Sequence, residues 1–122
     1  MLVPPWNRID DEIIAGLVEI GYKALSVYGR EKPSKLPLLN THIDLMDWHG
    51  TGGGRPHDIL FGEIATRLRA EPQNTIATGI LTHHLVHDGN AWTFLEKLFD
   101  LTADHPACHW RASRSVMAEL SP

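Results

Sequence analysis

The chain has 122 residues, of which 43% are hydrophobic and 21% are charged, and this length and composition predict one globular domain, residues 1–122. Its 15 acidic and 11 basic residues give a net charge of -4 without a cluster of lysine and arginine, which argues against nucleic acid as a partner. Cys108 is the only cysteine, so the chain cannot form an intrachain disulfide. No apolar run approaches the about 20 residues of a membrane helix, and the first residues do not resemble a secretory signal. We therefore expect a cytoplasmic protein without a membrane partner.

The first third of the chain alternates between strand and helix signals. Leu2 and Val3 indicate the end of a strand, because the prolines that follow cannot donate to a sheet. A helix is expected from an N-cap at Asp10 to a C-cap at Gly21, since apolar residues recur there at helical spacing. Residues 23–28 predict a short strand, and residues 29–37 form a polar loop.

The next strand is predicted over residues 38–44. Its period-two pattern places Asn40, His42 and Asp44 on one face and apolar residues on the other, as in a barrel strand whose inner face opens towards a site. A glycine-rich loop over residues 49–55 then leads to Pro56, which suits the first position of a helix.

Residues 75–83 predict the third clear strand. Asn90 is expected to cap a helix with the apolar set Ala91, Leu95, Leu98, Phe99 and Thr102. A last strand over residues 107–112 and a final helix from Ser113 to Leu120 complete the chain. This alternation predicts an α/β fold: a partial (β/α) barrel or an open, mostly parallel sheet with covering helices. Because open sheet edges tend to find partners, we also expect a homo-oligomer.

The stretch from Gly79 to Asp88 is the strongest candidate for a site, since an apolar run opens there onto three histidines and an acid. His83 ends one predicted strand and Asp44 ends another. A carboxylate within reach of an imidazole fixes its tautomer and favours its protonated form, which prepares a general acid. The alternative is a pair of partly exposed polar residues near a loop.

Three other features suggest a binding site, but each also has a purely structural explanation: the adjacent histidines, the glycine-rich loop and two tryptophans. His83 and His84 are neighbours on a strand and point to opposite sides, so we expect no metal site built from this chain alone. The loop from Gly50 to Arg55 precedes a helix and could bind a phosphate, but it lacks the Lys-Ser/Thr ending of a phosphate-binding loop, so a flexible surface loop explains it better. Trp6 and Trp48 could stack on a sugar ring or fill a core.

Four sequence segments, taken in order, resemble motifs of one enzyme family. Val3-Pro4-Pro5-Trp6-Asn7 is similar to that family's third motif, Arg-x-Pro-Tyr/Phe followed by a small residue, and residues 17–26 resemble the helix and strand after it. Asp44-Leu45-Met46-Asp47-Trp48 matches the fourth motif, Asp-x-x-Asp-Trp, and Leu81-Thr82-His83 matches the fifth, Leu-x-His. The chain thus resembles the C-terminal half of the polysaccharide deacetylase family (NodB-homology domain, carbohydrate esterase type).

The resemblance implies a (β/α) barrel that removes acetyl groups from N-acetylated carbohydrates with the help of a divalent metal such as zinc or cobalt. It assigns His83 as the general acid, tuned by Asp44 or Asp47. It implies that the backbone amide near Trp6 holds the oxyanion. It assigns substrate binding to the residues Pro5, Trp6, Asn7, Trp48 and Leu81.

The chain departs from the family pattern mainly in the motifs that activate the attacking water. The first motif, Thr-Phe-Asp-Asp, and the second, His-x-x-x-His, carry the base and the metal ligands, and neither is present in the chain. Val3 and Trp6 also replace the arginine and the tyrosine or phenylalanine of the third motif. We therefore expect an upstream segment or a complementing N-terminal half to supply these groups. The alternatives are a non-catalytic carbohydrate-binding or structural remnant, and an anion- or nucleotide-binding α/β module that uses the glycine loop.

Overall fold

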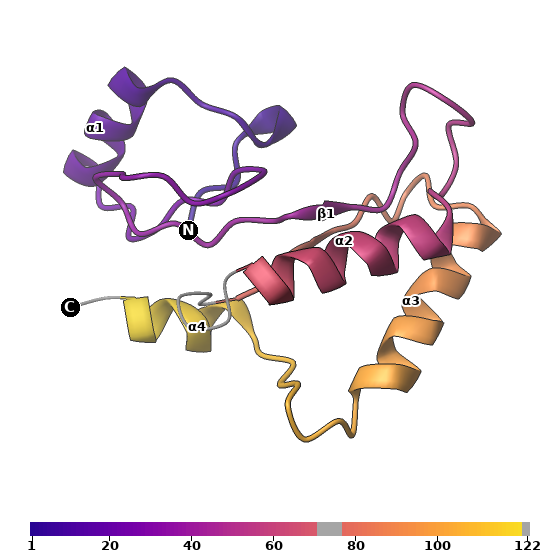
Figure 1. Cartoon of the computed structure of the whole chain (residues 1–122). Coiled ribbons are helices and arrows are strands. Elements are labelled where there is room, and N and C mark those ends of the chain that lie inside the picture. Colours follow the sequence, from indigo (N-terminus) through magenta and orange to yellow (C-terminus); the bar gives the residue numbers. More distant parts are fainter. Residues whose placement is uncertain (71–76, 121–122) are drawn as a thin grey trace. The chain divides into compact units, whose positions relative to one another are not determined.

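The computed structural model describes residues 1–70 and 77–120, and it has a mixed α/β fold (Figure 1). Two compact units are present: residues 1–42 with 77–79 and 112–120 form the first unit, and residues 43–70 with 80–111 form the second. Within the described residues, the elements are the 3-10 turn η1 (Pro5–Asn7), the helices α1 (Asp11–Glu19), α2 (His57–Ala70), α3 (Gly89–Thr102) and α4 (Ser113–Leu120), and the strands β1 (Ile43–Asp44) and β2 (Ile80–Leu81).

In the first unit, single parallel bridges replace the strand predicted over residues 23–28 and the first part of the strand predicted over residues 38–44. Leu25 bridges both Leu2 and Leu38, and Tyr28 bridges Thr41. The Leu39 N–H donates to the Leu25 carbonyl at 2.9 Å, and the Leu2 N–H donates to the Ala24 carbonyl at 3.0 Å. The predicted parallel pairing is confirmed, but prolines around these segments lack the N–H that longer ladders need.

Helix α1 covers these segments and ends as its sequence predicts. Gly21 has a φ of 93°, and its N–H donates to the Val18 carbonyl while the Tyr22 N–H donates to the Leu17 carbonyl. This is a Schellman turn, which needs a left-handed residue and therefore favours glycine. Asp10 stands at the N-cap position, although its side chain makes no capping hydrogen bond. The helix contributes to the core of the unit, whose buried residues are Ile14, Leu17, Leu25 and Leu36.

The second unit is built on the parallel pair of β1 and β2. Ile43 lies opposite Ile80 and Asp44 opposite Leu81, and α2 packs against β1 (Figure 1). The core beneath the pair contains the buried residues Ile43, Leu45, Leu60, Phe94 and Leu98. The Phe61 and Phe94 rings meet at 4.9 Å between centroids. The predicted strand over residues 75–83 is regular only at Ile80 and Leu81, and Thr75 and Ile76 lie outside the described residues.

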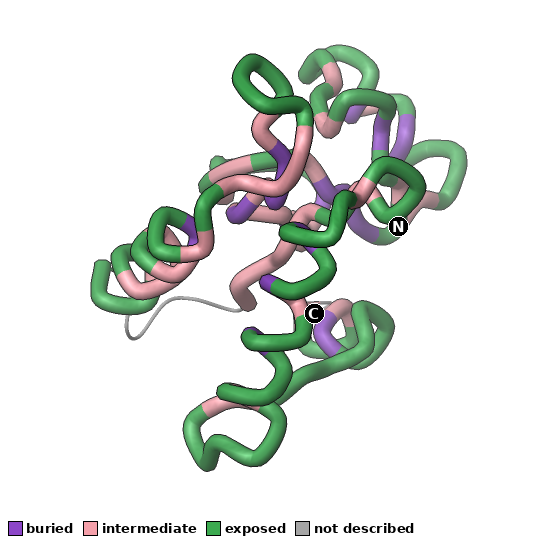
Figure 2. The backbone as a smooth tube through the Cα atoms, turned by 90° about the vertical axis from the view of Figure 1, so that its right-hand side faces the viewer, coloured by how far each residue is buried: buried purple, intermediate pink, exposed green. Residues whose placement is uncertain are grey.

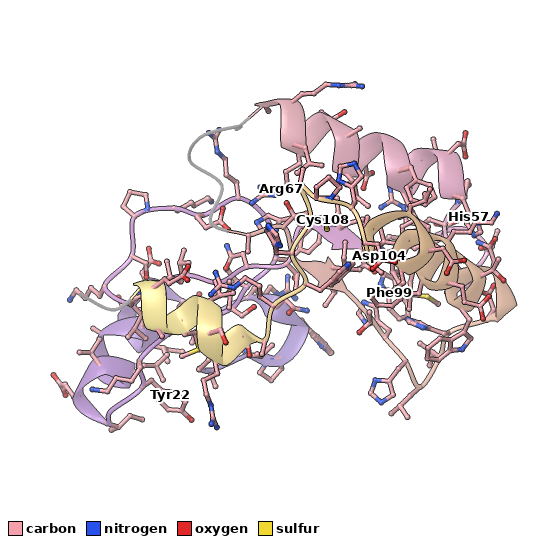
Figure 3. All side chains as sticks on the ribbon, turned by 90° about the horizontal axis from the view of Figure 1, so that it is seen from below. Tyr22, His57, Arg67, Phe99, Asp104 and Cys108 are labelled. Atoms are coloured by element: carbon pink, nitrogen blue, oxygen red, sulfur yellow. The ribbon has the colours of Figure 1, made fainter. Side chains whose placement is uncertain are left out.

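The start of α2 is tied to α3 by His57, whose position at the beginning of α2 is labelled in Figure 3. Its Nε2 donates to the Asn90 carbonyl at 2.9 Å, and its ring lies 5.6 Å from that of Phe94. Asn90 lies inside α3, and its side-chain amide donates to the Gly54 and Arg55 carbonyls, so it is not the helix cap that the sequence predicts. Asp88 caps α3 instead, accepting from the Ala91 N–H at 2.9 Å.

Two further sequence predictions for the second half of the chain are wrong. Phe94 rather than Phe99 fills the core, since Phe94 is fully buried and Phe99 is 45% exposed. Residues 107–112 form no strand; Trp110 packs on Phe99 at 4.7 Å between ring centroids and donates to Thr102 at 2.8 Å. The contacts of Trp110 with Phe99 and Thr102 thus anchor a segment that forms no strand, and most of residues 103–115 are exposed (Figure 2). In the described part of the chain, none of the helices has the length and hydropathy to cross a membrane.

Candidate functional site

The structure brings Asp44 and His83 together at the C-terminal ends of β1 and β2. The His83 Nε2 lies 3.1 Å from the Asp44 Oδ1, and the two side chains are 24% and 21% exposed. Parallel strands end at the same edge of a sheet, and Asp44 is in register with Leu81, two residues before His83. The expected convergence of an imidazole and a carboxylate is therefore present in the second unit.

The Asp44 carboxylate orients two aromatic side chains at once. Its Oδ1 accepts from the Met46 N–H at 2.9 Å as well as from His83, and its Oδ2 accepts from the Trp48 Nε1 at 3.1 Å. The Trp48 and His83 rings meet edge to face at 4.6 Å between centroids. Because an ionised carboxylate only accepts hydrogen bonds, the His83 Nε2 carries hydrogen, and Nδ1 is the nitrogen left to take up and release a proton.

His87 holds the loop that carries His83, and sequence reasoning missed this role. Its Nε2 accepts from the His83 backbone N–H at 2.9 Å, and its ring lies 4.7 Å from that of Trp92. Burial lowers the pKa of His87, and the nearby imidazoles of His83 and His84 act in the same direction. A neutral His87 that accepts at Nε2 carries its hydrogen on Nδ1, and this buried atom has no hydrogen-bond partner among the described residues.

The spacing of His83 and His87 was the signal available in the sequence. They are four positions apart, a spacing that would place two metal-binding histidines on one face of a helix. In the structure the two residues are instead joined through a backbone N–H, and the Val86 N–H closes the same turn by donating to the His83 carbonyl at 2.9 Å.

The glycine-rich loop uses its backbone amides within the chain. The N–H groups of Gly50 and Gly52 donate to the Asp47 carbonyl, and that of Thr51 donates to the Asp47 Oδ2 at 3.1 Å. Asp47 therefore shapes this loop, and its carboxylate is engaged there while that of Asp44 contacts His83.

The remaining loop amides are occupied as well. The Gly53 N–H donates to the Thr51 hydroxyl, the Gly54 N–H donates to the Asp88 Oδ1 at 3.0 Å, and the Arg55 N–H donates to the Leu45 carbonyl. Hydrogen bonds from the Ala91 and Gly54 amides hold the pKa of Asp88 below its usual range. A phosphate would have to displace these carboxylate contacts, which disfavours the glycine loop as an anion site.

Arg55 connects the end of β1 to α2, and the sequence did not indicate this. Its Nη1 donates to the Asp44 carbonyl at 3.1 Å and to the Glu63 Oε2 at 3.0 Å. A second guanidinium nitrogen pairs with the Glu63 Oε1. The forked ion pair fixes the backbone at the residue whose side chain orients His83.

The other residues assigned to substrate binding fall in both units. Trp48 and Leu81 belong to the second unit, and the Leu81 carbonyl accepts from the Leu45 N–H at 3.3 Å. Pro5, Trp6 and Asn7 belong to the first. Trp6 and Asn7 have φ values of 58° and 52°, a left-handed backbone that non-glycine residues rarely adopt outside functional sites and tight turns.

The divalent metal that the resemblance implies does not fit the residues at hand. Among residues 1–70 and 77–120, no group of three or more histidine, cysteine, aspartate or glutamate side chains is arranged to hold a metal ion. His83, the nearest candidate, is occupied by Asp44 at Nε2. We therefore assign no chemical step of these residues to a metal.

Comparisons with protein-family models, with curated proteins and with solved structures found no match. The resemblance to polysaccharide deacetylases therefore stays an expectation from the sequence motifs.

Proposed function

We propose that the chain carries the acid-donating half of a polysaccharide deacetylase-like hydrolase, which acts on N-acetylated carbohydrate, on part of a (β/α) barrel. The ordered motifs support this proposal. So does the arrangement of the sheet, since segments that follow one another in sequence pair in parallel, with α1 between Leu2 and Leu25 and α2 between β1 and β2. The observation that carries the proposal is the contact of Asp44 with His83 beside Trp48.

These residues suit one step of amide hydrolysis. When water has added to the acetyl carbon, the C–N bond breaks only if the nitrogen receives a proton, so that it leaves as an amine and acetate remains. His83 donates that proton from Nδ1, while Asp44 accepts at Nε2 and neutralises the imidazolium. Trp48 holds the imidazole ring edge to face and flanks the acetyl group.

Activation of the water requires groups other than this pair. The resemblance assigns that task to the motifs Thr-Phe-Asp-Asp and His-x-x-x-His, which the chain does not contain. The proposal therefore concerns proton donation to the leaving nitrogen, and it predicts that activity depends on His83.

Release of acetate from an N-acetylated chitooligosaccharide tests the proposal, with the chain combined with a polypeptide that carries the motifs Thr-Phe-Asp-Asp and His-x-x-x-His, in the presence of Zn²⁺ or Co²⁺. We expect His83→Ala to lower the rate by about 10²–10⁴-fold, the usual contribution of a positioned general acid. His84→Ala is the matched control, because His84 is the exposed neighbour, and it should retain the wild-type rate. Absence of acetate release by the wild-type chain in this combination with either metal, or a wild-type rate in His83→Ala, would overturn the catalytic proposal.

A second candidate is a non-catalytic carbohydrate-binding module. It is favoured by the exposure of Trp48, which at 49% leaves an aromatic face for a sugar ring, and by the lack of a metal-ligand group among the described residues. Saturable binding of the same oligosaccharide, lost in Trp48→Ala and accompanied by no acetate release, would support this candidate over the hydrolase.

A further inference from the structure

A pocket of about 220 Å³ lies in the first unit, and its lining includes none of the residues assigned above to proton transfer. Its rim comes from the end of η1, the start of α1 and the loop after Tyr28, and its floor comes from the bridged segments around Leu25 and Leu38. The resemblance covers only Asn7 and Leu25 among its lining residues and assigns a role to Asn7 alone, so the pocket needs an explanation of its own.

The charges around the pocket are unbalanced. Arg8, Arg30 and Lys32 line it, whereas Asp11 is the only acidic residue in its lining. This excess of positive charge occurs in a chain whose net charge is -4. A concave site with like charges on its rim concentrates ions of the opposite sign, and a guanidinium matches the geometry of carboxylate and phosphate oxygens.

The floor of the pocket is apolar. Leu25 and Ile14 are 1% and 8% exposed, and Leu38 is partly buried against them. The volume is below the about 300 Å³ at which sites for drug-sized ligands begin, so the occupant is compact. A ligand that suits both parts has one anionic group at the rim and a short apolar body on the floor.

The frame of the pocket is ordered by buried polar contacts. Asn40 is 2% exposed; its Oδ1 accepts from the Val27 N–H at 3.0 Å, and its Nδ2 donates to the Gly29 carbonyl at 2.9 Å. The Asn7 carbonyl accepts from the Tyr28 N–H at 3.0 Å, which holds the left-handed turn against the neighbouring segment. A site held in this way loses little conformational entropy on binding.

We propose that this pocket binds a small organic anion, with a carboxylate or phosphate group between Arg8 and Lys32 and a short aliphatic body over Leu25 and Ile14. The proposal is independent of the proposed hydrolase function, because the lining contains none of the residues that contact His83.

Titration of the isotope-labelled chain with pentanoate, followed by amide NMR, tests the proposal, and pentanamide serves as the neutral probe of the same shape. We expect pentanoate to shift the Leu25 and Ile14 signals saturably, and pentanamide to leave them unchanged. Pentyl phosphate is the third probe: the tighter of the two anions identifies which anionic group the rim prefers.

Single substitutions give the matched comparison. Arg8→Gln and Lys32→Gln should each weaken pentanoate binding by about fivefold, the effect of losing one partly exposed ion pair. Lys35→Gln is the control, because Lys35 is an exposed cation in the same loop that does not line the pocket, and it should bind like the wild type. Circular dichroism confirms that each variant is folded. No saturable shift with either anion, an equal response to pentanamide, or equal weakening by Lys35→Gln would overturn the proposal.

Discussion

Replacing Asp44 by alanine leaves three hydrogen-bond donors without their acceptor, and the structure allows the cost to be worked out. The Met46 residue is 3% exposed, so its N–H becomes an unpaired buried donor at a cost of about 1–3 kcal/mol. The Trp48 Nε1 and the His83 Nε2 are nearer to solvent and can bind water, which limits each loss to about 0.5 kcal/mol. The sum predicts that Asp44→Ala lowers the free energy of unfolding by about 2–4 kcal/mol.

Urea unfolding followed by circular dichroism measures this change, and Asp47→Ala is the control. The Asp47 carboxylate accepts from one exposed loop amide, that of Thr51, so its removal should cost about 1 kcal/mol or less. If Asp44→Ala unfolds at the wild-type urea concentration, or if Asp47→Ala is equally destabilised, the hydrogen bonds of Asp44 do not stabilise the second unit as the structure indicates.

Three further predictions concern protonation, buried polar groups and assembly. Because the pKa of His87 is lowered in the folded chain, the unfolded chain binds the proton more readily, and the free energy of unfolding should decrease as the pH falls below about 6.5. His87→Gln should remove this pH dependence in urea titrations at several pH values. An unchanged dependence in the variant would contradict this prediction. Asn40→Ala should destabilise the folded chain by about 2–3 kcal/mol through the loss of two buried hydrogen bonds. Thr41→Val should stabilise the folded chain, because the buried Thr41 hydroxyl has no partner among the described residues. Thermal unfolding that ranks the two variants in the opposite order would refute this reasoning. The short parallel ladders predict self-association through open edges, and sedimentation that shows a stable monomer would contradict it.

The pattern of apolar residues along the sequence was sufficient to predict the helices. α1, α2, α3 and α4 lie where helical spacing and flanking residues indicate them, and Gly21 ends α1 as predicted. These signals are local, because a helix satisfies its backbone within one segment and buries one face at a fixed period. The parallel direction of pairing also followed from the alternation of strand and helix signals.

The candidate site was partly predictable for a related reason. Asp44 ends β1 and His83 follows the end of β2 by two residues, and parallel strands bring their ends to one edge, so the pair followed from topology. The sequence favoured Asp44 over Asp47, because Asp44 ends the predicted strand, although both belong to the same motif. Only the structure shows that Asp47 is engaged in the glycine loop.

The sequence by itself thus determined the helices, the parallel pairing and the two strand ends that hold Asp44 and His83. Tertiary structure decided that Asp88 rather than Asn90 caps α3, because the choice depends on amides at Gly54 and Ala91. It also decided that Phe94 fills the core and that the lining of the first-unit pocket assembles from separate segments. These features depend on contacts between residues that are distant in the sequence, and the spacing of residues along one segment does not determine those contacts.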